Sequence, residues 1–321
     1  MKVSVIIPFY NSATLLTRTI DSIIAQTYTN IEVIMVDDGS TDDSYSIASK
    51  YINHYITVLK QCNAGASNAR NKGLLYSKGD FIQFLDAGDV IDPNKIAVQL
   101  EALQKNPEKL AVCKYKQFNV QDEITKSDYP DQSSFIYSCD NPQEFLINLW
   151  GGYGKMNFIQ TNCWLVPRKI IEKIGCWRAY RCPDDDGEFF ARVILASKGI
   201  VYTPGVYNFY HIDESGKNQL SRTKNHKYLM NSLLTIDLKY GYLQKYGHHN
   251  LLNRAIAAQY YRFAVDMYPL RKNLSTIAWK RFCSLGEDPP ELLLGGRMIQ
   301  LVYNLFGWRI ARLLRFYFRE S

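Results

Sequence analysis

The sequence predicts an α/β fold built around a mostly parallel, Rossmann-like sheet with flanking helices. Two observations support this prediction: short apolar segments alternate with helical segments from the N-terminus onward, and polar residues follow each apolar segment. Strands of such sheets are covered by helices on both faces, and ligands bind where the strands end. Beyond about residue 225 the pattern changes to helices alone, which predicts a C-terminal helical extension.

The expected elements follow from apolar runs, caps and turn residues. Strands are predicted at 3–7, 31–36, 56–59, 79–89, 159–166 and 200–203, the fourth ending on the carboxylates of Asp86 and Asp89. Helices are predicted at 13–26, 43–51, 67–76, 168–174, 183–197, 228–245, 251–267, 275–283 and 299–318. Ser12 is the expected N-cap of the first helix, because its hydroxyl can accept from a free backbone N–H.

Composition limits the class of protein. A chain of 321 residues that is 46% hydrophobic can bury a full-sized core with an extension. Seven cysteines without a CxxC pair or zinc spacing predict buried thiols in a cytoplasmic protein. The N-terminus lacks a signal-peptide pattern, and no segment offers about 18 uninterrupted apolar residues, so neither secretion nor a spanning helix is expected.

The positive charge is concentrated in the last third of the chain. Residues 221–321 contain 16 Lys and Arg against 6 Asp and Glu, which gives +10. Residues 1–220 contain 22 against 25, which gives −3. This asymmetry predicts that the C-terminal part contacts an anionic surface, either a membrane or nucleic acid. A solvated helical face is the alternative interpretation.

The C-terminal segment has the pattern of an amphipathic helix that lies on a membrane surface. Apolar residues share one predicted face: Phe306, Ile310, Leu313, Leu314 and Tyr317. Arginines gather towards another: Arg309, Arg312, Arg315 and Arg319. The alternative is a helix packed on its own domain with the Arg head groups outward. We favour the membrane surface, because the apolar face and the Arg row both reach the chain end.

Polar and aromatic residues collect at the predicted strand ends: Pro8, Tyr10, Asn11, Asp37, Asp38, Asn63, Gly65, Arg70, Asp86 and Asp89. An aromatic ring can flank a base, a carboxylate can accept from a base N–H, and an Arg can lie near a diphosphate. No GxGxxG follows the first strand and no GxxxxGK[ST] is present, which argues against dinucleotide enzymes and P-loop NTPases. Several of these residues also suit ordinary turns and helix caps.

Five motifs together resemble one known family. They are VSVIIPFYN, the helix end QTY, IEVIMVDDGSTD, NAGASNARNKGL and GDFIQFLDAGD. In this order they resemble the nucleotide-sugar half of family-2 inverting glycosyltransferases, which have the GT-A fold. The resemblance covers roughly residues 1–215. It implies a catalytic domain at 1–225, followed at 226–321 by a helical extension that ends in the basic amphipathic helix.

The resemblance implies roles for residues on the donor side. Pro8 and Tyr10 would border the nucleoside, and Asp38 would accept a hydrogen bond from the base. Asn63 would also contact the donor, and Arg70 would lie near the diphosphate. A further residue, Asp86, would approach the donor ribose, the phosphates or a metal ion.

The resemblance also implies a catalytic base in the acidic run that opens the helix near residue 185. The family has an acidic pair followed by apolar residues and an Arg, and counting back from Arg192 places the base at Asp186. The alternatives are Asp184 and Glu188, because the register of an acidic run is easily shifted. Acidic residues in a first helical turn also interact favourably with the helix dipole, which is the structural interpretation.

A divalent ion, Mn²⁺ or Mg²⁺, is the expected cofactor. The family's acidic motif usually reads Asp-x-Asp-Asp, and Gly88 occupies the third position, which normally supplies the metal ligand. The predicted ligands are therefore Asp86, Asp89 and His211, with the ion weakly held. Two alternatives are an ion held mainly by phosphate and water, and charge neutralisation by helix ends and Arg70 without a metal.

The resulting prediction is an inverting transferase that moves a hexosyl or N-acetylhexosaminyl group. The donor is expected to be a nucleotide sugar, most simply a UDP-sugar, and the acceptor a glycan hydroxyl, lipid-linked, in surface polysaccharide synthesis. The protein is expected in the cytoplasm, peripheral on the inner face of the cell membrane, without a nucleic-acid partner. A non-catalytic nucleotide-sugar-binding scaffold or sensor on the same fold is one alternative. A nucleic-acid-binding protein, with steeply salt-dependent binding, is another.

Overall fold

A computed structural model describes residues 1–119, 131–212, 225–247, 249–291 and 293–318. Arg319, which belongs to the predicted arginine row, lies outside these residues. The chain divides into two compact units, Met1–Phe145 with Ile159–Thr223, and Leu146–Phe158 with Lys224–Ser321. The functional division into a catalytic domain at 1–225 and an extension at 226–321 stays a prediction.

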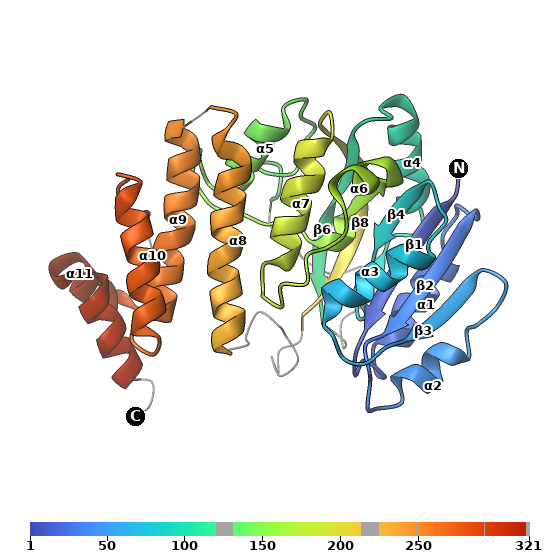
Figure 1. Cartoon of the computed structure of the whole chain (residues 1–321), viewed down its shortest axis with the longest axis horizontal. Helices are drawn as coiled ribbons and strands as arrows, with labels where there is room; N and C mark the ends of the chain where they lie inside the picture. The colour runs from blue at the N-terminus through green and yellow to red at the C-terminus, as the bar shows by residue number, and fades with distance from the viewer. Residues whose placement is uncertain (120–130, 213–224, 248, 292, 319–321) are drawn as a thin grey trace. The chain divides into compact units, whose positions relative to one another are not determined.

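The first unit contains an eight-stranded sheet in the order β3-β2-β1-β4-β7-β6-β8-β5. Its first half is parallel and consists of β1 (Val3–Phe9), β2 (Ile31–Asp37), β3 (Ile56–Lys60) and β4 (Phe81–Phe84) (Figure 1). The register places Phe9 opposite Asp37, and Asp37 opposite Lys60. The prediction of a mostly parallel α/β sheet is confirmed for this half, and its strand ends share one edge.

The second half of the sheet is mixed. It consists of β5 (Val90–Ile91), β6 (Leu110–Phe118), β7 (Trp164–Pro167) and β8 (Ile200–His211). The strand β7 runs antiparallel to both β4 and β6, whereas β8 runs parallel to β6. The predicted strand at 159–166 is wrong in its first part, where a 3₁₀ helix, η2 (Thr161–Cys163), precedes β7. The prediction also missed β5 and β6.

Among the described residues, the first unit contains α1 (Leu16–Ile24), α2 (Ser44–Ser49), α3 (Ala66–Tyr76), α4 (Lys95–Lys105), α6 (Arg168–Ile174) and α7 (Asp185–Ala196). A further helix, α5 (Pro142–Leu149), begins in the first unit and ends in the second. The predicted side-chain cap at Ser12 is wrong. Its hydroxyl donates to Tyr10 O at 3.0 Å, and its backbone oxygen accepts from Leu15 N and Leu16 N. The helix therefore begins at Leu16, after a backbone-bonded turn.

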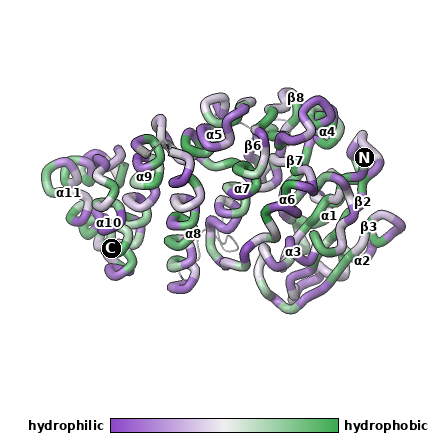
Figure 2. The backbone as a smooth tube through the Cα atoms, turned by 45° about the horizontal axis from the view of Figure 1, so that its top comes forward, coloured by the Kyte–Doolittle hydropathy of each residue, from purple (hydrophilic) through white to green (hydrophobic). Residues whose placement is uncertain are grey.

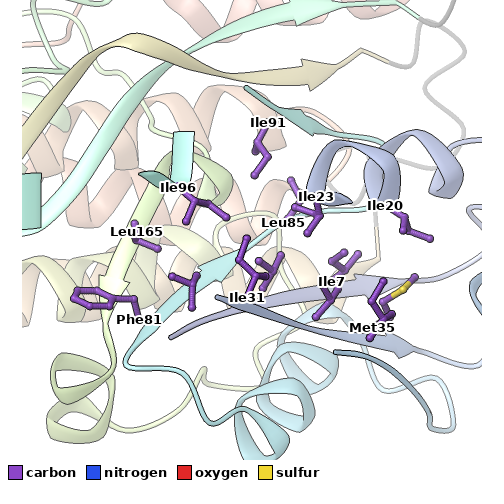
Figure 3. Packing of buried hydrophobic residues seen from close by; sticks show 14 of the residues in the cluster. Ile7, Ile20, Ile23, Ile31, Met35, Phe81, Leu85, Ile91, Ile96 and Leu165 are labelled. Atoms are coloured by element: carbon purple, nitrogen blue, oxygen red, sulfur yellow. The ribbon is translucent and has the colours of Figure 1, made fainter. Parts of the chain in front are cut away.

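Apolar side chains bury both faces of the parallel strands. On one face Ile7 and Met35 pack in the cluster that includes Ile20 of α1 (Figure 3). On the other face Ile34 and Val36 pack with Ala69 of α3. A Cβ added at Gly73 would lie 2.3 Å from Ile6 Cγ2, so glycine permits a close approach of α3 to β1. This approach fixes α3, and with it Arg70, at the strand ends.

The cysteines are all free, but they are not all buried. Cys62, Cys176 and Cys283 are exposed, so the prediction of buried thiols is wrong for these three. Each exposed cysteine lies outside a strand, where alternating burial does not apply.

The second unit contains α8 (His226–Gln244), α9 (His249–Met267), α10 (Lys272–Ser284) and α11 (Arg297–Tyr317). Its core is aromatic: the ring of Tyr261 lies 5.2 Å from Phe282 and 6.4 Å from Trp308, centroid to centroid. Gly307, with φ of 79°, interrupts α11. None of the helices in the described ranges combines the length and apolar character needed to cross a bilayer.

Candidate active site

The strand ends of the parallel half are joined by backbone hydrogen bonds. Asp38 N donates to Phe9 O at 2.9 Å, and Leu85 N donates to Ile6 O at 3.0 Å. Pro8 is buried within β1, opposite Val36. Three predicted donor residues, Pro8, Asp38 and Asp86, therefore lie at the same edge of the sheet.

Tyr10 stands at this edge on a rigid turn. The residue is 48% exposed, although its neighbours in β1 are buried. Asn11 follows with φ of 47°, a left-handed conformation that Asn tolerates. Its Oδ1 accepts from Thr41 N at 2.9 Å, and its N–H donates to Ser40 Oγ at 3.0 Å. The turn after β1 is thus bonded to the loop after β2, which leaves the Tyr10 ring available to a ligand.

Asp38 organises the loop that follows β3. Its Oδ1 accepts from Gln61 Nε2 and from Ala64 N, both at 2.8 Å, and its Oδ2 accepts from Gly65 N at 2.8 Å. Asp38 is buried. Each carboxylate oxygen has two lone pairs, so Oδ2 retains capacity for a further donor. The hydrogen bond between Asp38 and the nucleotide base stays a prediction. The carboxylate also has a structural role, because it holds the loop that follows β3.

Asn63 is held by an arginine from a distant part of the chain. Arg181 Nη2 donates to Asn63 Oδ1 at 2.9 Å and to Asn63 O at 2.8 Å, while its Nε donates to Ala64 O at 3.0 Å. The loop Asn63–Gly65 therefore lies between Asp38 on one side and Arg181 on the other. Any contact of Asn63 with the sugar donor depends on these hydrogen bonds from Arg181.

The Asp38→Ala variant is expected to bind UDP more weakly and also to unfold at a lower temperature. A fully buried donor that loses its acceptor costs about 1 to 3 kcal/mol, and Ala64 N and Gly65 N, which are partly buried, both lose theirs. Titration calorimetry and thermal unfolding measure the two effects separately. The Asp38→Asn variant keeps one acceptor oxygen and should lose less stability. Unchanged UDP affinity in a folded Asp38→Ala protein would refute the base contact.

Arg70 joins the donor side to the acidic run. Its Nη2 lies 2.7 Å from Asp86 Oδ1, and its Nη1 lies 3.8 Å from Asp185 Oδ2. The guanidinium also stacks 4.5 Å from the centre of the Trp177 ring. Arg70 is buried, whereas the Asp86 side chain is 43% exposed. One cation thus bridges the end of β4 and the start of α7.

The segment between α6 and α7 is fastened to α3. Asn71 Nδ2 donates to Trp177 O, and Trp177 N donates to Asn71 Oδ1, both at 2.8 Å. The Trp177 ring stacks on Phe189 of α7 at 3.9 Å between centroids. Sequence reasoning missed Trp177 and Arg181. The only signal for them was their position within ten residues of the predicted base.

The carboxylates of the acidic run have different surroundings. Asp185 accepts from Ser67 Oγ and faces Arg70, so it ties α7 to α3. Glu188 is buried, and its two oxygens pair with Arg192 Nε at 2.8 Å and Arg192 Nη2 at 3.0 Å. This pairing makes Glu188 a poor alternative base. Asp184 is the residue that precedes the first turn of α7.

Asp186 has the properties of a proton acceptor. Burial, followed by repulsion from Asp185 and Asp184, raises the pKa of Asp186 to about 7, although Arg70 opposes this shift. Its Oδ1 accepts from the adjacent Gly187 N at 2.8 Å. A general base works best when its pKa lies near the working pH. The assignment of Asp186 as the base stays a prediction, and these features support it.

Asp89 and His211 are joined beneath the turn after β4. His211 N donates to Asp89 Oδ1 at 2.9 Å, and Asn162 Nδ2 donates to Asp89 Oδ2. Burial and the nearby Asp86 raise the pKa of Asp89 well above its ordinary value. A buried carboxyl with both oxygens engaged is poorly suited to hold an ion. The hydrogen bonds therefore favour a structural task for Asp89 over its predicted metal ligation.

The remaining predicted ligands fit an ion that is held mainly by other groups. Asp86 offers a half-exposed carboxylate, and a Cβ added at Gly88 would lie 3.7 Å from His211 Nδ1. Across the described ranges of the chain, no three His, Cys, Asp or Glu side chains gather in a way that would hold a metal. Metal ligation by Asp86 and His211 stays a prediction; an ion held through these two residues would take its other ligands from phosphate and water, as is common for Mg²⁺.

Comparison with known proteins places this site in context. Residues 4–175 match the model of glycosyl transferase family 2. Glycosyltransferase GlyA of Streptococcus pneumoniae is 31% identical over 243 residues, which cover 71% of this chain and 32% of GlyA. The succinoglycan biosynthesis protein ExoW of Rhizobium meliloti is 28% identical, over 70% of this chain and 76% of ExoW. The chain thus spans about a third of GlyA and most of ExoW.

Solved structures share the fold. Residues 1–349 of S. aureus TarS, in complex with UDP-GlcNAc, superpose with a TM-score of 0.70 at 17% identity, over 100% of this chain and 92% of that chain. The mannosyltransferase PcManGT of Pyrobaculum calidifontis, in complex with GDP-Man and Mn²⁺, superposes with a TM-score of 0.56 at 16% identity, over 100% and 88%. The GT-A-type fold with C-terminal helices is confirmed, and the chain belongs to glycosyl transferase family 2.

Proposed function

We propose that this protein is an inverting transferase that moves a hexosyl or N-acetylhexosaminyl group from a UDP-sugar to a hydroxyl of a glycan acceptor. The observation that carries the proposal is the bridge made by Arg70. It joins Asp86, at the strand end where donors bind in α/β sheets, to Asp185, which adjoins Asp186. In this proposal Asp186, as the proton acceptor, stands beside the edge that would hold the diphosphate.

In the proposed reaction, the Asp186 carboxylate takes the proton of the acceptor hydroxyl as that oxygen attacks the anomeric carbon. The new glycosidic bond forms while the bond to the nucleoside diphosphate breaks, and the diphosphate leaves on the opposite face, so the anomeric configuration inverts. Asp185 stays paired with Arg70 and Ser67, which holds the start of α7 in position. A divalent ion held through Asp86 and His211 would supply positive charge to the leaving diphosphate.

The nature of donor and acceptor rests on relatives and on charge. The UDP-GlcNAc complex of TarS and the name of ExoW support a UDP-sugar and polysaccharide synthesis. The charge of +10 over residues 221–321 supports an acceptor at an anionic membrane, such as a lipid-linked glycan on the inner face of the cell membrane. We therefore propose a peripheral protein of the cytoplasmic membrane surface, with no nucleic-acid partner.

The structure of α11 supports contact with a lipid surface, but the predicted arginine row does not face outward as a whole. Arg312 Nη2 donates to Asp266 O at 3.3 Å, and Arg315 Nη1 donates to Leu294 O, so two of the predicted Arg row face their own unit. Trp308 is buried on the same side.

The outward side of α11 carries exposed apolar residues, among them Phe306, Ile310 and Tyr317 of the predicted apolar face. Met298, Leu301 and Leu305, at helical spacings of three and four, form an outer stripe that is 59–82% exposed. Figure 2 shows hydrophobic and hydrophilic positions interleaved along this helix. A second copy of this strongly basic unit would be repelled by its like charge. An anionic bilayer instead offers an apolar interior for the outer stripe and a surface of opposite charge.

The double variant Leu301→Ser, Leu305→Ser is expected to stop co-sedimenting with phosphatidylglycerol vesicles, because the outer stripe loses its apolar contact area. Deleting residues 297–321 should have the same effect, but it also removes Trp308 from the aromatic core. The control is Leu75→Ser, which alters a still more exposed leucine on α3. Co-sedimentation equal to that of the wild type would contradict membrane docking through α11.

A donor panel tests the proposed function most simply. Thermal unfolding with several nucleotide sugars, with and without Mn²⁺ or Mg²⁺, should show a rise in Tm for one donor class, because a ligand that binds only the folded state stabilises it. Failure of every nucleotide sugar to shift Tm would argue against this function. Binding without turnover would instead favour the scaffold alternative.

A further inference from the structure

Asn162 lies directly beneath the turn that carries Asp86 and Asp89. The residue belongs to η2 and is 1% exposed. Its Oδ1 accepts from Asp86 N at 3.1 Å, and its Nδ2 donates to Asp89 Oδ2. A single amide therefore bonds both ends of the acidic turn, from a segment more than seventy residues away in the sequence.

The segment around Asn162 is itself fixed by a buried polar network. Asn162 O accepts from Gln83 Nε2 at 3.0 Å, and Cys163 O accepts from Gln99 Nε2 at 2.9 Å. The oxygens of both glutamines accept from Lys95 Nζ, which is fully buried. Breaking any of these bonds leaves a buried polar group without a partner, which is costly. The backbone on which Asn162 stands is therefore held firmly.

An asparagine suits this position for a chemical reason. The turn presents one backbone donor, at Asp86, and one acceptor, the Asp89 carboxylate, and an amide side chain offers an acceptor and a donor at once. Leucine has similar size but neither group. Aspartate keeps the acceptor and replaces the donor with a second acceptor facing Asp89.

We propose that Asn162 is a positioning residue of the donor site, which holds Asp86 where it meets the diphosphate of a nucleotide sugar. The inference rests on the proposed function for the identity of the ligand. Asn162 itself touches no substrate, so its effect passes through the Asp86–Asp89 turn. Residues that orient metal ligands through hydrogen bonds typically contribute about 10- to 100-fold to metal affinity or activity, and a comparable effect is expected for the orientation of Asp86.

The test compares Asn162→Leu with Gln132→Leu. Gln132 is also fully buried, and its amide makes two hydrogen bonds, to Tyr115 N and Tyr115 O, away from the acidic turn. Both variants should lose similar stability. Only Asn162→Leu is expected to raise the Kd for UDP-sugar about ten-fold or more. Only that variant should also speed amide exchange at Asp86, measured without any ligand.

The Kd for nucleotide sugar and the amide exchange at Asp86 test the proposed function and the positioning role of Asn162 separately. Should wild-type protein bind no nucleotide sugar, the proposed function fails, and amide exchange at Asp86 still decides the positioning role. Unchanged exchange and unchanged Kd in Asn162→Leu would overturn that role while leaving the function intact. If Asn162→Leu does not fold, Asn162→Asp takes its place. That variant should keep the Asp86 amide protected but still raise the Kd, and a wild-type Kd in it would also overturn the proposal.

Discussion

The Asp186→Asn variant is expected to bind nucleotide sugar as the wild type does and to transfer sugar about 10² to 10⁴ times more slowly, the usual cost of losing a general base. Asparagine keeps the shape of the side chain and the hydrogen bond from Gly187 N, but it cannot take a proton. Steady-state kinetics and calorimetry with the same donor measure the two quantities. The matched control is Asp184→Asn, which removes a neighbouring carboxylate from the same acidic run.

The pH dependence gives the prediction a second readout. Because burial and the neighbouring carboxylates raise the pKa of Asp186 to about 7, the residue is protonated and inactive as a base at lower pH. Wild-type kcat/KM should therefore fall about ten-fold per pH unit below about pH 7 and level off above it. Near-normal turnover in Asp186→Asn, together with a large loss in Asp184→Asn, would move the base to Asp184.

Chelation is expected to have the other large effect. Transfer should vanish in EDTA and return only at relatively high Mn²⁺ or Mg²⁺, since Gly88 offers no carboxylate and Asp89 is buried and engaged. Nucleotide Kd measured with and without metal shows whether the ion acts in donor binding. Full activity in EDTA would show that the ion is dispensable, and Arg70 with helix ends would then carry the leaving-group charge.

The Gly88→Asp variant sharpens this test. An added carboxylate should lower the metal concentration needed for half-maximal activity. The structure also predicts a loss of stability, because Gly88 has φ of 111° and an added Cβ would lie 3.2 Å from Leu15 Cδ1. Gly88→Ala carries the same strain without the carboxylate and is the matched control. Equal metal requirements in both variants would exclude a ligand at this position.

Local pattern explains which elements the sequence predicts well. The first four strands are short, mainly apolar runs, each with a single polar residue inside it, and they are bounded by turn residues; the structure has strands at each of them. The second half of the sheet pairs β7 antiparallel with both β4 and β6. Such pairing depends on contacts between distant segments, so the 3₁₀ turn at Thr161–Cys163 and the strands β5 and β6 were missed.

The candidate site shows the same limit, because contacts between distant segments cannot be predicted from local sequence. Tyr10 and Asp86 could be named from their position after strands, because that position alone brings them to one edge, and Arg70 could be named from the motif NAGASNARNKGL that opens the next helix. The structural roles of Asp38 and Asp89 could not be predicted in this way. Their hydrogen-bond partners Gly65, Asn162 and His211 come from other elements. In each case a carboxylate predicted to bind a ligand also accepts hydrogen bonds from the chain itself.

The most direct test of the account is release of nucleoside diphosphate from a panel of nucleotide sugars, with a glycan acceptor and Mn²⁺ present. Wild-type protein is expected to release diphosphate from at least one donor. Under the same conditions Asp186→Asn should release it about 10² to 10⁴ times more slowly at equal donor occupancy. Donor binding without release by the wild type, or equal release by both proteins, would contradict the assignment of an inverting transferase with Asp186 as its base.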